Sequence, residues 1–211
     1  MMSAIALEAK NNGELVYAYR QGAEEYNYKD IGPWGKVRNG YCAALSMKWM
    51  ALRLQNKDLE YDLSSRMAKK EDWRITRLHN LTKMSAEGYG YDYVMEELGT
   101  KRGVATTLSG APTALNIANK IAADKGLYMI QYKRSGGGHM AAIQNDGTNI
   151  HYFDANHGHI VLKGQTRFRN WYAKFLTDSG YAARYTVKTI VTPVTWSSSG
   201  TVASLKQRFG G

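Results

Sequence analysis

The only cysteine of this 211-residue chain, Cys42, lies in the stretch VRNGYCAALSMKWM at residues 37–50. Gly40 permits a sharp turn just before it, and an apolar stripe at helical spacing starts with it: Cys42, Leu45, Trp49 and Leu52. This pattern predicts a helix over residues 42–56. A helix N-terminus favours the thiolate, the nucleophilic form of cysteine, whereas a cysteine that only fills the core is inert, and both readings stay open for Cys42 taken alone.

A second pair of reactive side chains comes from a predicted β-hairpin in the stretch HMAAIQNDGTNIHYFD, residues 139–154. Asp146-Gly147 stands between two runs of alternating apolar and polar residues, which is a strong hairpin signal. With a two-residue type I′ turn at this dipeptide, His139 lies directly opposite Asp154. Directly opposed Cβ atoms are about 4.5 to 5.5 Å apart, close enough for the carboxylate to accept a hydrogen bond from the imidazole.

The same register sorts the histidines of the hairpin. His151 is an odd number of positions from Asp154, so it points to the other face of the sheet, opposite Ala142. A longer loop would shift the register by one residue and separate the histidine from the aspartate.

A lone thiol together with a histidine–aspartate pair predicts nucleophilic catalysis. A neighbouring imidazolium favours the thiolate of Cys42, and the carboxylate of Asp154 would fix the tautomer and orientation of the His139 ring. The thiol would then be acylated by an amide or ester substrate.

Three short segments carry a resemblance to a known family: GYCAALSMKW around the cysteine, GGHMAAI around the histidine and YFDANHG around the aspartate. In this order, over residues 37–160, the chain resembles the YopT/AvrPphB-type cysteine peptidases, which are bacterial effectors of papain-like fold. The resemblance implies that Cys42 is the nucleophile, His139 the general base and Asp154 its orienting partner.

The oxyanion hole has less support from the sequence. The segment before Cys42 lacks a glutamine at the oxyanion spacing of papain, so we expect the backbone N–H of Cys42 and one side-chain donor to form the hole. Asn39 is the nearest amide. It is equally suited to a turn beside Gly40, because asparagine tolerates a left-handed φ.

The predicted function is a cysteine protease of effector or toxin type that cleaves a protein of a target cell through a thioester acyl-enzyme. The same three residues also serve amidases, deamidases and acyl transferases, for example a cell-wall amidase toxin, because all of them acylate the thiol. No residue decides whether water or an amine attacks next. A non-catalytic basic binding module is a third reading.

The sequence contains two other patterns that could form a site. Imidazole and carboxylate groups gather within nine residues and would suit zinc: His151, Asp154, His157 and His159. Their spacing matches no metal-binding signature, and the hairpin register already uses Asp154. The stretch SGGGH lacks the Lys-Ser/Thr ending of a phosphate-binding loop. We therefore predict neither a metal nor a cofactor.

The net charge of +10 favours an anionic surface or an acidic partner besides the protein substrate. The bases are scattered and form no known nucleic-acid module. The sequence has no run of 18 apolar residues and no signal-peptide pattern, so we expect a soluble protein with no transmembrane segment, exported by a signal-peptide-independent route. A single cysteine forms no intrachain disulfide, which suits action in the cytoplasm of the target cell.

The order of the predicted elements, helices first and strands second, indicates an α+β fold. We expect an N-terminal helical part that carries Cys42 to pack on a C-terminal antiparallel sheet that carries His139 and Asp154. Helices are expected over 42–56, 63–83, 85–99, 112–126 and 166–177, and strands over 127–132, 139–144, 148–153, 159–162 and 181–191. Residues 1–36 are expected to be a lead-in segment with little structure or at most a strand, 37–195 the papain-like catalytic domain, and 196–211 a flexible tail.

Overall fold

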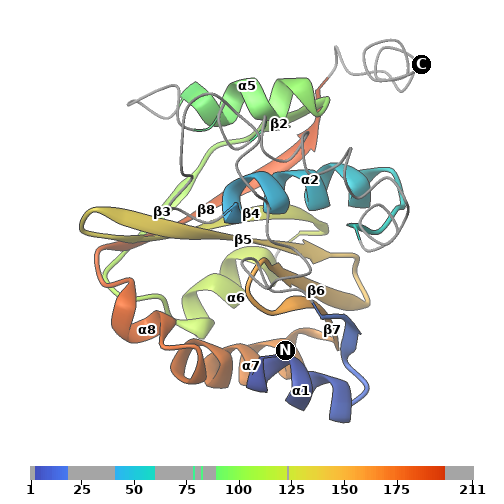
Figure 1. Cartoon of the computed structure of the whole chain (residues 1–211), viewed down its shortest axis with the longest axis vertical. Helices are drawn as coiled ribbons and strands as arrows, with labels where there is room; N and C mark the ends of the chain where they lie inside the picture. The colour runs from blue at the N-terminus through green and yellow to red at the C-terminus, as the bar shows by residue number, and fades with distance from the viewer. Residues whose placement is uncertain are drawn as a thin grey trace, which may run out of the picture.

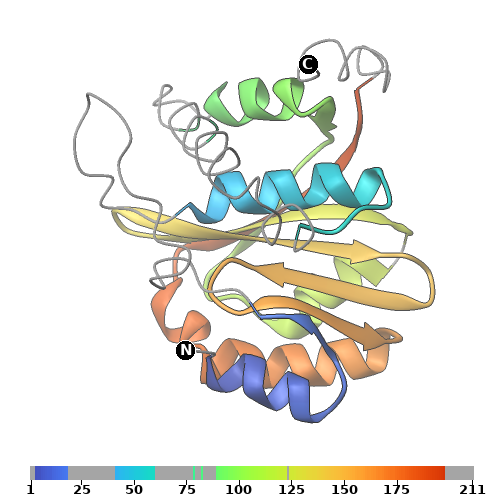
Figure 2. The ribbon, with the colours of Figure 1, turned by 45° about the vertical axis from the view of Figure 1, so that its right-hand side comes forward.

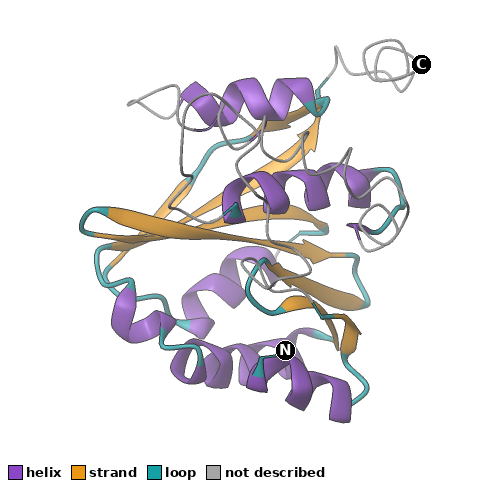
Figure 3. Ribbon diagram, in the orientation of Figure 1, coloured by secondary structure: helices purple, strands orange, loops and turns teal. Residues whose placement is uncertain are grey.

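The computed structural model describes residues 3–18, 41–59, 78, 82, 89–122 and 124–197. Within these ranges the fold has three layers, with a twisted antiparallel sheet between two groups of helices (Figures 1 and 3). One face carries α2 (Cys42–Leu54) and α5 (Tyr89–Glu97). The other carries α1 (Ala4–Asn11), α6 (Ala114–Ala122), α7 (Gln165–Asp178) and α8 (Tyr181–Arg184).

The sheet has the order β1-β7-β6-β5-β4-β8-β2, and β3 also pairs with β8. All described strand pairs are antiparallel. In chain order the strands are β1 (Leu15–Tyr17), β2 (Thr100–Arg102), β3 (Thr106–Ser109), β4 (Gly126–Arg134), β5 (Gly137–Asn145), β6 (Asn149–Asp154), β7 (Gly158–Lys163) and β8 (Lys188–Trp196). Figure 2 shows the successive hairpins from β4 to β7 running side by side.

Each face of the sheet has its own apolar core, because successive side chains of a strand point to opposite faces. Along β4, Leu127 and Met129 belong to the core under α2, and Tyr128, Ile130 and Tyr132 belong to the core that α6 and α7 cover. The α2 helix is buried on most sides, and Trp49 stacks on Phe153 of β6 with ring centroids 5.6 Å apart. The α+β prediction is therefore confirmed, with helices on both faces of the sheet.

The predicted register of the β5–β6 hairpin is wrong by two residues. Asp154 pairs with Ala141 instead of His139, and Gln144, not Ala142, lies opposite His151. The connection is longer than a type I′ turn because the Asp146 carboxylate accepts the backbone N–H groups of Thr148 and Asn149, at 2.8 and 2.7 Å. A shift of two residues preserves the face of every side chain, so His139 and Asp154 still share one face.

The strand predicted over 181–191 is wrong in its first part. Residues Tyr181–Arg184 form α8, and β8 begins only at Lys188. Gly180, at φ +71°, lets the chain turn at the end of α7, and Tyr181 then points into the core with 2% of its surface exposed. The other predicted strands and the helices at 42–56, 85–99, 112–126 and 166–177 are present with shifted ends. Most of the predicted helix at 63–83 lies outside the described residues.

The expectation of little structure or at most a strand at the start of the chain is wrong for residues 4–11, which form a helix, whereas residues 15–17 form a strand. The helix α1 buries Ile5 and Ala9 in the core shared with α7, and β1 pairs with β7 at the edge of the sheet. Lys174 of α7 also donates to Glu8 at 2.8 Å. The expected boundary between residues 36 and 37 lies outside the described residues, as does the tail from residue 198, and both stay predictions.

If α1 is an integral part of the fold, Ala9→Asp should destabilise the protein strongly. Ala9 has no exposed surface, so the new carboxylate would be desolvated without a partner, and we expect the free energy of unfolding in urea to fall by more than about 3 kcal/mol. Leu7→Asp on the exposed side of the same helix is the control, with an expected change within about 0.5 kcal/mol. Equal urea midpoints for the two variants would contradict the docking of α1.

Candidate active site

The Cys42 thiol lies at the start of α2, where Tyr41 is the N-cap residue and no side chain caps the helix. The thiol is partly exposed and is hydrogen bonded to the His139 side chain and to the backbone amide of Met140. Burial raises the pKa of this thiol, but the hydrogen bond and the charge of His139, with the Met140 amide, lower it below its ordinary value. The surroundings of Cys42 therefore favour the thiolate.

The meeting of α2 with β5 depends on a gap in the sheet. The strand β6 ends at Asp154 opposite Ala141, so the part of β5 before Ala141 has no β6 partner. The start of α2 takes that place. Ser46, one turn after Cys42, donates to the Met140 carbonyl at 3.1 Å, while the Met140 amide reaches the Cys42 sulfur. The side chains of Cys42 and Ser46, on one face of α2, thus bond the Met140 N–H and C=O groups that a neighbouring strand would otherwise pair with.

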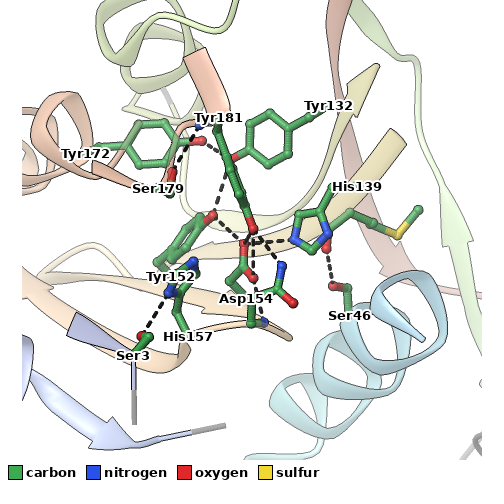
Figure 4. Close-up of polar contacts among 12 residues, drawn as sticks. Ser3, Ser46, Tyr132, His139, Tyr152, Asp154, His157, Tyr172, Ser179 and Tyr181 are labelled. Carbon is green, nitrogen blue, oxygen red and sulfur yellow. Dashed lines mark hydrogen bonds and ion pairs between the residues drawn. The ribbon is translucent and has the colours of Figure 1, made fainter. Parts of the chain in front are cut away.

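The His139 ring is held by Asp154 on the face of the sheet opposite α2. Its Nε2 atom lies 2.9 Å from Asp154 Oδ2, and both side chains are buried (Figure 4). Burial lowers the pKa of His139, but the charge of Asp154 and hydrogen bonds to Asp154 and Cys42 raise it well above the ordinary value. Because Nε2 faces the aspartate, Nδ1 is the ring nitrogen left for the thiol.

Asp154 is fully buried and is surrounded by hydrogen-bond donors. Besides His139, the Tyr152 hydroxyl donates to Oδ2 at 3.0 Å, the Tyr181 hydroxyl at 3.1 Å, and the backbone N–H of Asn156 donates to Oδ1 at 2.8 Å. Burial raises the pKa of this carboxyl, but the charge and hydrogen bond of His139, the charge of His157 and the Asn156 N–H hold it well below its usual range. A carboxylate has about four acceptor positions, so this set of donors leaves Asp154 no room for a proton of its own.

The direction of the tyrosine protons follows from their other partners. Asn156 Nδ2 donates to the Tyr181 hydroxyl oxygen at 2.9 Å, so the Tyr181 proton is available to Asp154. On the opposite side, Tyr132 bridges Tyr152, at 3.3 Å, and Tyr172 through hydroxyl contacts (Figure 4). The Asp154 carboxylate is therefore the end point of a buried chain of hydroxyl groups from β4, β6 and α7.

The other residues considered for a site lie elsewhere. His151 and His159 hydrogen bond to each other at 3.0 Å, and His157 contacts Ser3 at 3.0 Å, so the four residues of the zinc alternative do not converge. In the described part of the chain no group of three or more histidine, cysteine or acidic residues is placed to hold a metal ion. Asn39 lies outside the described residues, so its role in an oxyanion hole stays a prediction.

Sequence reasoning missed Ser46, Tyr152 and Tyr181. Tyr152 stands two residues before Asp154 in the same strand, and this spacing alone places both side chains on one face. No local signal marks Ser46 or Tyr181, because their partners Met140 and Asp154 are distant in the sequence.

The chain belongs to the Peptidase C58 family, described as Yersinia/Haemophilus virulence surface antigen, whose model matches residues 61–195. The match contains His139 and Asp154 and begins after Cys42. This family and its fold neighbours define the class of the protein as a cysteine-peptidase-like bacterial virulence protein. In the described residues no helix is both long and apolar enough to cross a membrane.

Two solved structures are similar to this chain. The Pseudomonas avirulence protein AvrPphB is 13% identical, with a TM-score of 0.57 over 74% of this chain and 91% of its own. PatoxP, a cysteine protease-like domain of the Photorhabdus asymbiotica toxin PaTox, is 11% identical, with a TM-score of 0.44 over 92% of this chain and 58% of its own. The likeness to AvrPphB confirms the predicted papain-like fold. No curated protein sequence matches the chain.

Removing the Tyr181 hydroxyl should lower the stability of the folded protein, because Asp154 loses a hydrogen-bond donor. In Tyr181→Phe the carboxylate loses one donor and the Asn156 amide loses its acceptor, so we expect the free energy of unfolding at neutral pH to fall by about 1 to 3 kcal/mol. The lowered pKa of Asp154 gives stability that is present above the unfolded pKa and lost as the pH falls. The unfolded-state pKa is the same in both proteins, so the difference from wild type should stay constant at neutral and mildly acidic pH and narrow only as the pH falls through the lowered folded-state pKa of Asp154.

Tyr185→Phe is the matched control, because Tyr185 packs on both His139 and Tyr181 and makes no hydrogen bond through its hydroxyl to a described residue. Its stability should stay within about 0.5 kcal/mol of wild type. Urea unfolding at neutral pH measures both variants, and a Tyr181→Phe loss no larger than that of Tyr185→Phe would contradict the role of the Tyr181 hydroxyl at Asp154.

Proposed function

We propose that this protein is a cysteine protease of bacterial effector type, which cleaves a protein of a target cell with Cys42 as nucleophile, His139 as general base and acid, and Asp154 as the residue that orients His139. The observation that carries the proposal is the continuous hydrogen bonding from the thiol through the imidazole to a buried carboxylate. The membership of the chain in the Peptidase C58 family supports the same reaction class.

The catalytic cycle follows from the charges at the site. The Cys42 thiolate attacks the carbonyl carbon of the scissile amide and forms a C–S bond, and the carbonyl electron pair moves onto oxygen. As the C–N bond breaks, His139 gives its proton to the leaving amine, which leaves a thioester. The neutral His139 then takes a proton from water, the hydroxide oxygen attacks the thioester carbon, and the carboxylic acid product leaves as the thiolate forms again.

The negative oxygen of the tetrahedral intermediate needs donors that are already in place. The first amide groups of an α-helix have no carbonyl partner within the helix, and Cys42 is the first residue of α2. We assign its backbone N–H as one oxyanion donor and keep Asn39 as the proposed side-chain donor. The reducing cytoplasm of a target cell would keep the lone thiol in its active form.

The thiolate–imidazolium pair gives a test that needs no substrate. Alkylation of Cys42 by iodoacetamide, mapped by mass spectrometry from about pH 5 to about pH 9, should persist well below the ordinary thiol pKa of about 8.5. In His139→Ala the imidazolium is absent and burial remains, so the midpoint of the reaction should move up to the ordinary value or above it. A wild-type profile equal to that of a free thiol would refute the proposed nucleophile.

Variants of the three residues should differ in a fixed order. We expect Cys42→Ala to abolish proteolysis of target-cell lysate, His139→Ala to lower kcat by about 10² to 10⁴-fold, and Asp154→Asn to cost less, because it disturbs orientation and leaves the base in place. New protein N-termini identified by mass spectrometry are the measurement, and circular dichroism checks folding. Equal residual activity of the three folded variants would contradict this assignment, and conversion of glutamine to glutamate without new N-termini would indicate a deamidase.

A further inference from the structure

Two lysines lie directly opposite each other on the face of the sheet that carries α2. Lys133 of β4 pairs with Lys188 of β8, so the two side chains leave the sheet side by side. Like charges in this position repel each other, which is destabilising in an antiparallel pair. Lys133 is half-buried, and neither lysine forms an ion pair with an acidic side chain in the described part of the chain. Within the described residues, the sheet thus holds two positive charges side by side without an acidic partner.

The Lys133 side chain runs toward the reactive thiol. On the other side of β4, Lys133 pairs with Gly138, the residue before His139. A Cβ atom on Gly138 would lie 3.3 Å from Lys133 Cδ and 2.6 Å from the Tyr132 carbonyl oxygen, so the absence of a side chain lets the lysine cross β5 here. Burial and the charge of Lys188 lower the pKa of Lys133, while the attraction of the Cys42 thiolate raises it. The ammonium group is therefore within electrostatic reach of the sulfur.

Another positive charge on this side of Cys42, that of Arg102, is neutralised within the protein. Arg102 of β2 lies over the Tyr91 ring and forms a bidentate pair with Asp92 of α5, with contacts of 2.7 and 2.5 Å. Burial raises the pKa of Tyr91, and the Cys42 charge raises it further, so this ring also lies near the thiol. In the described part of the chain, Lys133 thus lies near Cys42 beside the residue that precedes His139, and Lys188 lies opposite Lys133, with no ion pair to an acidic side chain for either lysine.

We propose that Lys133 and Lys188 bind a carboxylate side chain of the protein substrate next to the scissile bond, so that the enzyme selects acidic segments. This inference rests on the proposed function of Cys42. A substrate carboxylate between the two ammonium groups would relieve their repulsion and bring the carbonyl toward the sulfur. The net charge of +10 would attract such segments from a distance.

Two small alkylating agents can measure how strongly the positive charges of Lys133 and Lys188 attract an anion to the Cys42 sulfur. Iodoacetate and iodoacetamide both place a carbon on sulfur and release iodide, but only iodoacetate carries a carboxylate. We expect the ratio of their rate constants at Cys42 to fall about three- to tenfold in Lys133→Met, which keeps a chain over Gly138 and removes the charge. Lys133→Arg should keep the ratio near wild type, and so should Lys120→Ala on α6, on the opposite face of the sheet.

The same variants also test whether the lysines determine which substrate segments are cleaved. Cleavage sites mapped in target-cell lysate should carry aspartate or glutamate near the scissile bond. Two synthetic peptides of one mapped site, one with glutamate and one with glutamine at this position, should differ in kcat/KM by about tenfold for wild type. The difference should be much smaller for Lys133→Met. An unchanged iodoacetate ratio in Lys133→Met, or equal cleavage of the two peptides by wild type, would overturn the inference. If Cys42 of the wild-type protein did not react with iodoacetamide at low pH, the proposed function itself would be refuted.

Discussion

The buried carboxylate of Asp154 is the constraint on which the rest of the site depends. An ionised carboxylate with no exposed surface would be very costly without partners, and four donors from β5, β6, α8 and the turn after β6 compensate it. The charge of Asp154 and its hydrogen bond raise the pKa of His139 against the effect of burial. The pKa of Cys42 is lowered in turn by the hydrogen bond and charge of His139 and by the Met140 amide, against burial and the repulsion of Asp154.

The second constraint is the early end of β6. If β6 continued past Asp154, it would pair with the first residues of β5, and no room would remain for the start of α2. Since it stops opposite Ala141, the backbone of Met140 is open on one side and bonds Ser46 and Cys42 instead. The thiol on one face of the sheet and the histidine on the other thus meet around the edge of a single strand.

The N-terminal residues support this arrangement from the far side. Ser3 caps α1 and also contacts His157, which stands three residues after Asp154 at the end of the turn, directly before β7. His157 and Tyr181 pack with ring centroids 6.1 Å apart, so α1, the turn and α8 form one packed group around the carboxylate. A weakly periodic sequence gave little indication of this, because an eight-residue helix draws its stability from burial of Ile5 and Ala9 and not from its own pattern.

Local spacing alone determined the α+β class, the helix that starts at Cys42, and the shared face of His139 and Asp154. The last prediction held although the turn was wrong, because strand side chains alternate with a period of two and the true register differs by two residues. Tertiary structure alone decided that Tyr181 reaches Asp154, that Ser46 reaches Met140, and that Lys133 faces Lys188. Each of these contacts joins segments that are distant in the chain, and periodicity within one element carries no information about which part of another element packs against it.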